Sequence, residues 1–174
     1  NRKDVVACFR IYNEQHNSHE AVHTSLDRLE SPDALVVVGG QQSGLFTGPM
    51  LVIYKAATII KAAREAEERL GRPVIPIFWI AGEDHDWDEV NHTYVMAKDP
   101  QAVKIKLNKQ PERRSSVSAI KVDTVEWKQA MADIEQCLPD SEHKTDIMHM
   151  IEQGLTESYG LSDAFAKLMG RLFG

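Results

Sequence analysis

An acidic stretch that contains one imidazole is the part of this chain best suited to chemistry. Residues 81–86 read Ala-Gly-Glu-Asp-His-Asp and directly follow an apolar run at residues 74–80. Carboxylates beside a histidine supply a general base and a partner that orients it, and carboxylate oxygens are the ligands that Mg²⁺ prefers. We predict catalytic roles for Asp84, His85 and Asp86, and ligand-binding roles for Glu83, Asn91 and His92.

Two other interpretations of the acidic stretch stay open. His85 and His92 could bind a transition metal together with Asp84 or Asp86, as in a metal-dependent hydrolase. Their spacing matches no zinc signature, so we predict no metal site. The stretch could also be an exposed loop that caps the element after it.

A glycine-rich stretch at residues 39–49 follows a second apolar run, at residues 35–38. Its glycines permit close backbone approach, and its amides and hydroxyls suit a carboxylate, a phosphate or a sugar. It contains neither GxxxxGK[ST] nor GxGxxG, the two common phosphate-binding patterns. We predict that ligand is bound here by Gln41, Gln42, Ser43, Gly44, Thr47 and Gly48, with Lys55 reaching the same cleft.

A strand–helix–strand unit would bring the two stretches together. Each apolar run is short and continuous, as in the buried strands of a parallel sheet covered on both faces. A helix between them would begin with Pro49 at its first position and end at Gly71. Its sheet-facing residues would be Met50, Ile53, Ala57 and Ile60. Ligands bind at the carboxyl ends of such strands, where both polar stretches lie.

The rest of the chain is predicted to add helices and a small β segment to this core. We expect an N-terminal helical segment at residues 1–33, a Rossmann-like βαβ core at 34–98 and an inserted β segment at 99–122. Residues 123–174 would form a helical segment leading to a missing C-terminal part. The β segment would contain strands at 103–107 and 117–122, which alternate apolar and polar residues. The predicted fold class is α/β, with a Rossmann-like parallel sheet.

Composition narrows the class of protein. The 174 residues carry a formal net charge of −6 with both signs interspersed, which argues against a nucleic-acid partner. No apolar run approaches the roughly 20 residues that cross a membrane. Cys8 and Cys137 match no zinc or CxxC spacing and fit a reducing cytoplasm. His16, His19 and His23 share one helical face, which we interpret as a solvated face instead of a metal site.

The two polar stretches resemble a known family. The similarity covers Gly40 to Pro49, Tyr54 to Ala56, Phe78 to Asp86 and Glu89 to Tyr94, and extends to Leu161–Phe165 and Leu172–Gly174. In these residues the chain resembles the N-terminal part of the BshC family of bacillithiol biosynthesis. The resemblance implies a Rossmann-like core in a longer protein that also has connecting segments and a coiled coil.

The resemblance also implies an activity, a ligase that joins cysteine to glucosaminyl-malate in the last step of bacillithiol synthesis. Gln41, Gln42 and Ser43 would then hold substrate, and Asp84, His85 or Asp86 would take the amine proton. The cofactor stays open, with ATP or ADP and Mg²⁺ as candidates, and a homo-oligomer would form through parts outside this chain. A nucleotide- or sugar-binding module without catalysis is the main alternative.

Overall fold

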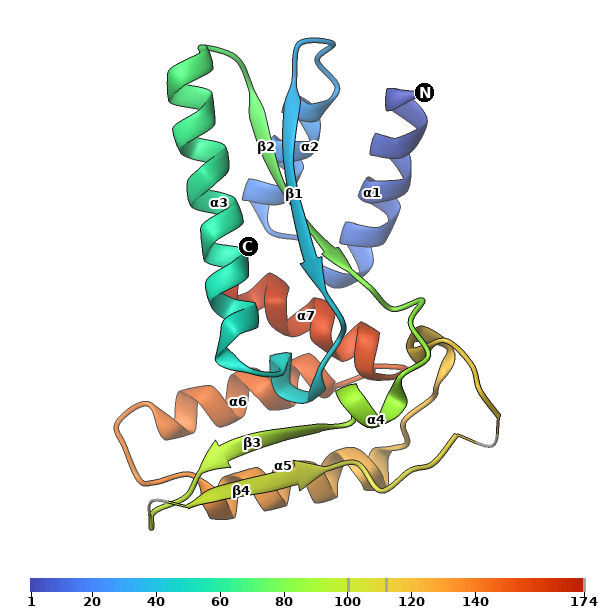
Figure 1. The fold of residues 1–174 in the computed structure, drawn as a ribbon, viewed down its shortest axis with the longest axis vertical. Helices are drawn as coiled ribbons and strands as arrows, with labels where there is room; N and C mark the ends of the chain where they lie inside the picture. The colour runs from blue at the N-terminus through green and yellow to red at the C-terminus, as the bar shows by residue number, and fades with distance from the viewer. Residues whose placement is uncertain (100, 112, 174) are drawn as a thin grey trace.

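The computed structural model describes residues 1–99, 101–111 and 113–173. Pro100 and Glu112 of the predicted β segment and Gly174 of the predicted helical segment lie outside the described residues. The fold is α/β, as predicted (Figure 1). Its elements, in chain order, are α1 Arg2–His16, α2 Glu20–Leu29, β1 Leu35–Gln41, η1 Leu45–Thr47, α3 Met50–Leu70, β2 Val74–Ile80, α4 Trp87–Val90, β3 His92–Met96, β4 Ala102–Lys106, η2 Val117–Ala119, α5 Thr124–Cys137, α6 Lys144–Leu155 and α7 Leu161–Phe173.

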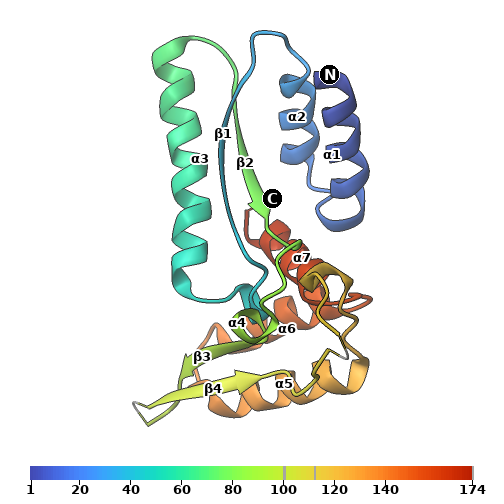
Figure 2. The ribbon, with the colours of Figure 1, turned by 45° about the vertical axis from the view of Figure 1, so that its right-hand side comes forward.

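The predicted strand–helix–strand unit is confirmed. Strands β1 and β2 pair in parallel, from Leu35 opposite Val74 to Gln41 opposite Ile80. Helix α3 joins them and packs along one face, while α1 and α2 lie on the other side of the sheet (Figure 2). Both strands therefore end at the same edge, and the glycine-rich and acidic stretches leave from it.

Helix α3 begins one position later than predicted, and its predicted sheet-facing residues are right only in part. Pro49 is its N-cap instead of its first residue, and Gly71 ends it in the left-handed conformation, with φ +63°. Met50 and Ala57 are exposed, contrary to the prediction, whereas Ile53 is half-buried and packs against a buried cluster. Nearly every residue at the start of this helix is apolar, so the helical period does not fix the phase. The buried positions are Val52, Ala56, Ile59 and Ala63.

Two glycines at the end of β1 allow its neighbours to come close. A Cβ on Gly39 would lie 2.6 Å from Cδ1 of Ile59, so the missing side chain lets α3 approach the strand. A Cβ on Gly40 would lie 2.1 Å from the carbonyl oxygen of Trp79 in β2. These glycines are therefore packing residues as well as part of the ligand-binding stretch.

The second face of the sheet is covered only in part. Ile75 of β2 packs in a buried cluster with Val6, Leu26 and Leu29 of α1 and α2. Further along, Trp79 is 53% exposed, although we expected the strands to be buried. On β1, Val36 and Val38 are also exposed. Helix α3 therefore covers one face of the sheet, as predicted, whereas α1 and α2 cover only part of the other face.

A second layer lies below the strand edge. Strands β3 and β4 pair antiparallel and form a sheet separate from β1 and β2 (Figure 1). The predicted alternation is confirmed in β4, where Ile105 is buried and Leu107 follows it into the core. Helices α5 and α6 contribute side chains to the buried hydrophobic cluster that contains Ile105 and Leu107.

The predicted strand at 117–122 is wrong. Residues 117–119 form the short helix η2, and the N–H groups of Val117 and Ser118 bond to the acidic stretch instead of to a strand. The N–H of Val117 donates to the carbonyl of Asp84 at 2.8 Å, and that of Ser118 donates to Gly82 at 2.9 Å. These two hydrogen bonds hold the backbone of the acidic stretch in place.

The predicted C-terminal helical segment is divided into separate helices, of which α5 and α6 come first. Helix α5 begins at Thr124, and its N-cap is the Asp123 carboxylate, which accepts from the N–H groups of Val125 and Glu126. Helix α6 begins at Lys144.

His16 belongs to a contact between helices, not to a solvated face. Its Nε2 lies 2.6 Å from Oδ1 of Asp163 in α7, and its Nδ1 lies 2.7 Å from the carbonyl oxygen of Tyr12. His19 is the N-cap of α2 and accepts from the N–H of Ala21. The His16 contact joins the N-terminal helices to the C-terminal one. Within the described residues, no helix is both long and apolar enough to cross a membrane.

Candidate functional site

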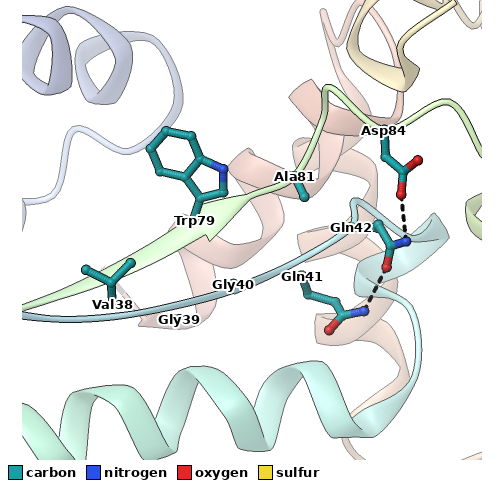
Figure 3. A pocket seen from close by; sticks show the side chains of 8 residues that line it. All are labelled: Val38, Gly39, Gly40, Gln41, Gln42, Trp79, Ala81 and Asp84. Carbon is teal, nitrogen blue, oxygen red and sulfur yellow. Dashed lines mark hydrogen bonds between the residues drawn. The ribbon is translucent and has the colours of Figure 1, made fainter.

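The two polar stretches meet through one side chain, the amide of Gln42. Its Nε2 donates to Oδ2 of Asp84 at 2.8 Å and to Oε2 of Glu89 at 3.1 Å (Figure 3 shows the bond to Asp84). The parallel pairing of β1 and β2 places Gln42 and Asp84 just beyond the ends of neighbouring strands. The amide therefore bridges the glycine-rich stretch and two carboxylates of the acidic stretch.

The chain of hydrogen bonds continues away from the carboxylates to a lysine. Nε2 of Gln41 donates to Oε1 of Gln42 at 2.9 Å (Figure 3). Nζ of Lys55, in α3, donates to Oε1 of Gln41 at 2.6 Å and to the carbonyl of Gly40 at 3.1 Å. A cation, two amides and two carboxylates thus form one continuous network across the strand edge.

Asp84 is held in its ionised form. The amide of Gln42 and, next, the N–H of His85 at 2.6 Å lower the pKa of this carboxyl below its ordinary value. Hydrogen bonds to the charged form favour that form, and they outweigh the small opposing effect of desolvation here. A carboxylate of this kind suits the binding of a cation better than the uptake of a proton.

Two cavities open on either side of the glutamine pair. The first has a volume of about 460 Å³ and is lined by the end of β1, by Trp79 and by Asp84 (Figure 3). The second, of about 270 Å³, lies between the start of α3 and β3 and is lined by Glu89, His92 and Tyr94. Gln41 and Gln42 line both cavities, so they are the shared wall.

Other predicted residues of the acidic stretch differ in how they are placed. Glu83 and His85 are exposed at its surface. Asp86 is the N-cap of α4, where its Oδ1 accepts from the N–H of Glu89 at 3.2 Å. Asn91 is fully buried, with its side chain between Asp88 and His92. Of these, His92 lines the second cavity.

The remaining predicted residues of the glycine-rich stretch shape its backbone. Ser43 is fully buried, with its hydroxyl 2.8 Å from that of Ser162 in α7. Phe46, Thr47 and Gly48 are successive residues with positive φ, at 51°, 73° and 72°. A β-branched residue such as threonine rarely adopts this conformation, so the turn stores strain of the kind found at ligand sites. Gly44 lines the second cavity.

Two residues of the site were not predicted. Glu89 belongs to the acidic stretch, but its contact with Gln42 follows from the short helix α4, which turns Glu89 back toward β1. Ser162 lies far along the chain and meets Ser43 only through the packing of α7. The spacing of Asp86 and Glu89 is a helix-capping signal that could have identified α4.

No metal centre is preformed in the part of the chain that the structure describes. Within it, no three His, Cys, Asp or Glu side chains are grouped so as to hold a metal ion. Asp84, His85 and His92, the ligands of the hydrolase alternative, are therefore not assembled here. Gln42 occupies the space between Asp84 and Glu89 instead.

Comparison with known proteins matches the whole chain to one family. Residues 1–174 match the family model described as "Bacillithiol biosynthesis BshC, N-terminal Rossmann-like domain". Proteins named "Putative cysteine ligase BshC" from Oceanobacillus iheyensis and Geobacillus sp. strain WCH70 are 39% and 37% identical over 174 and 172 residues, or 99% of this chain. The chain spans 32% of the length of each of these relatives. It belongs to the BshC family, as its N-terminal Rossmann-like domain.

Proposed function

We propose that the whole protein is a cysteine ligase that forms an amide between L-cysteine and the amine of glucosaminyl-malate, and that this domain supplies part of the active site. The observation that carries the proposal is the bridge from Gln42 to Asp84 and Glu89, between two cavities. Membership of the family and the names of the relatives support it. A site of this kind can hold two small polar molecules on either side of one wall.

The reaction sets requirements that these side chains can meet. The amine arrives as an ammonium ion, loses a proton and attacks the cysteine carboxyl carbon. The nitrogen loses a second proton as the C–O bond breaks, and the oxygen leaves in water or, if ATP activates the carboxyl group, on the phosphate or AMP attached to it. Asp84 stays ionised and would hold the ammonium at a further acceptor site of its carboxylate, beside the bond from the Gln42 amide. His85 is exposed next to it, and its imidazole would take the proton as a general base. The N–H groups of the glycine-rich stretch would stabilise the oxyanion.

The test uses the full-length protein with cysteine and glucosaminyl-malate, and detects the condensed thiol by mass spectrometry. Asp84→Asn is expected to lower kcat/KM about 10- to 100-fold, the loss of one charge-assisted contact. Asp146→Asn, at an exposed position in α6, is the matched control and should keep full activity. Parallel reactions with and without ATP and Mg²⁺ show whether a nucleotide activates the carboxyl group.

Three outcomes decide the proposal. Product from the wild type and the control, but little from Asp84→Asn, supports both the ligase and its site. No product in any reaction would reject the ligase activity and favour a binding module. Full activity of Asp84→Asn would indicate that the reaction takes place outside this domain.

We further propose a cytoplasmic location and a homo-oligomer formed through parts of the protein outside this chain. Cys8 is exposed and both cysteines are free thiols, which a reducing compartment maintains. Cell fractionation and light scattering of the full-length protein measure the two properties. A monomer, or a protein in the membrane fraction, would contradict them.

A further inference from the structure

The direction of the hydrogen bonds across the glutamine pair is fixed at both ends. The ammonium group of Lys55 can only donate, so the atom of Gln41 that it meets at 2.6 Å must be the oxygen. The ionised carboxylate of Asp84 can only accept, so the atom of Gln42 that it meets must be the nitrogen. Asparagine and glutamine amides are often ambiguous, but here the charges at the two ends leave one assignment.

This direction determines what the pair can offer to a ligand. Both hydrogens of Gln42 Nε2 are used, by Asp84 and Glu89. One hydrogen of Gln41 Nε2 is used by Gln42 Oε1. Among contacts within the described residues, one N–H of Gln41 is left, together with one lone pair on each of the two side-chain oxygens. Both side chains line the cavities, so a donor and an acceptor lie next to each other on the shared wall.

A neighbouring donor and acceptor match a hydroxyl group, which accepts one hydrogen bond and donates another. A carboxylate or phosphate would leave the Gln42 oxygen without a donor. It would also lie close to Asp84 and Glu89, whose charges repel it. The wall is therefore suited to the hydroxyl groups of a sugar and unsuited to an anion.

We propose that Lys55 is a positioning residue, which orients the Gln41–Gln42 pair so that the pair binds a hydroxyl group of the sugar portion of the substrate. The identity of that sugar rests on the proposed function. Lys55 does not need to contact the substrate itself, because its Nζ is engaged by Gln41 and Gly40. Without Lys55, the Gln41 amide can turn over and present its oxygen where a donor is required.

The experiment is a double-mutant cycle in the full-length protein, with glucosaminyl-malate binding measured by calorimetry in the absence of cysteine. Lys55→Met is expected to weaken binding about tenfold, and Lys55→Arg, which keeps a donor-only group, to weaken it less. In a Gln41→Ala background, Lys55→Met should have no further effect, because its route to the ligand is already broken. Lys61→Met removes an exposed lysine from the same helix and should bind as the wild type does.

Several results would overturn the inference. Equal binding by Lys55→Met and the wild type would show that Lys55 does not orient the wall. Additive effects of Lys55→Met and Gln41→Ala would show that Lys55 contacts the ligand directly. No binding of glucosaminyl-malate by the wild type would remove the sugar assignment. Because no turnover is involved, these results are independent of whether the ligase reaction is observed.

Discussion

At the scale of single residues, the amide of Gln42 controls the charge of the site. It is the largest cause of the lowered pKa of Asp84, and it also contacts Glu89. Two carboxylates that share one amide lie close together, which is a favourable place for an incoming ammonium group. A cation held there adds a charge-assisted hydrogen bond to the Asp84 carboxylate, which is stronger than the bond from the neutral amide.

Removing this amide should change how Asp84 titrates. In Gln42→Ala, the pKa of Asp84 is expected to rise toward the ordinary value of about 3.9. Because the folded-state pKa is lowered in the wild type, the stability linked to Asp84 is present above about pH 3.9 and is lost as the pH falls through the folded-state pKa. The variant should lose less stability on acidification over that range.

The measurement is a ¹³C NMR titration of full-length protein labelled at the aspartate carboxyl carbons. Asp140 provides an internal control, because Lys98 and Lys144 lower its pKa at a distant place on the surface. Its titration should be the same in both proteins. An unchanged Asp84 curve in Gln42→Ala would show that the amide does not set the charge of the site.

At the scale of elements, the close contact of β1 with β2 depends on the absence of a side chain at Gly40. A Cβ there would lie 2.1 Å from a carbonyl oxygen of β2, and a backbone atom cannot swing aside. Gly40→Ala is expected to lower the free energy of unfolding by about 1–3 kcal/mol or more, as overpacking does. Urea denaturation of the full-length protein measures the change.

Gly71→Ala is the matched control for the effect of conformation without a clash. Gly71 has φ +63°, and a Cβ there would meet no heavy atom within 4 Å. Its cost should be about 1–2 kcal/mol, from the left-handed conformation alone. A smaller loss at Gly40 than at Gly71 would show that the strand can move away from the added methyl group.

The strand–helix–strand unit could be predicted because its signals are local. Run length, Pro49 and Gly71 mark its boundaries, and the parallel connection then brings both polar stretches to one edge. The face of α3 could not be predicted, because an almost wholly apolar start satisfies several helical phases. The segment at 117–122 alternates like a strand, but the N–H groups of Val117 and Ser118 bond to the acidic stretch, a contact between distant residues that alternation does not encode.

The sequence predicted where the candidate site lies, but not the hydrogen bonds that join its side chains. Gln42 and Asp84 were both named from the sequence, since residue type and strand order bring them close. That Gln42 joins Asp84 to Glu89, and that Lys55 bonds to Gln41 instead of extending into water, depends on side-chain rotamers and on the position of α4. These are set by packing, which a linear pattern does not contain.

At the scale of the whole molecule, α7 connects the layers. Its Leu161 and Leu168 belong to the buried cluster of the second layer, and its Phe165 belongs to the buried cluster that contains Val52 and Ala56 of α3. Asp163 of the same helix holds His16 of α1, and Ser162 holds Ser43 beside the site. The helix thus links both ends of the chain and supports the glycine-rich stretch from behind.

Removing a large side chain from the centre of α7 should therefore destabilise the whole domain and not only this helix. Phe165 is 1% exposed and lies beside Phe78 of β2, with the ring centroids 6.2 Å apart. Phe165→Ala is expected to cost about 3–5 kcal/mol of unfolding free energy, while Val125→Ala, at a position that is 76% exposed, should cost less than about 0.5 kcal/mol. Hydrogen exchange of the full-length variant should show lost protection in β2 and α3 as well as in α7. Loss confined to α7 would mean that the layers are stable without it, and that Ser162 is not needed to hold the glycine-rich stretch in place.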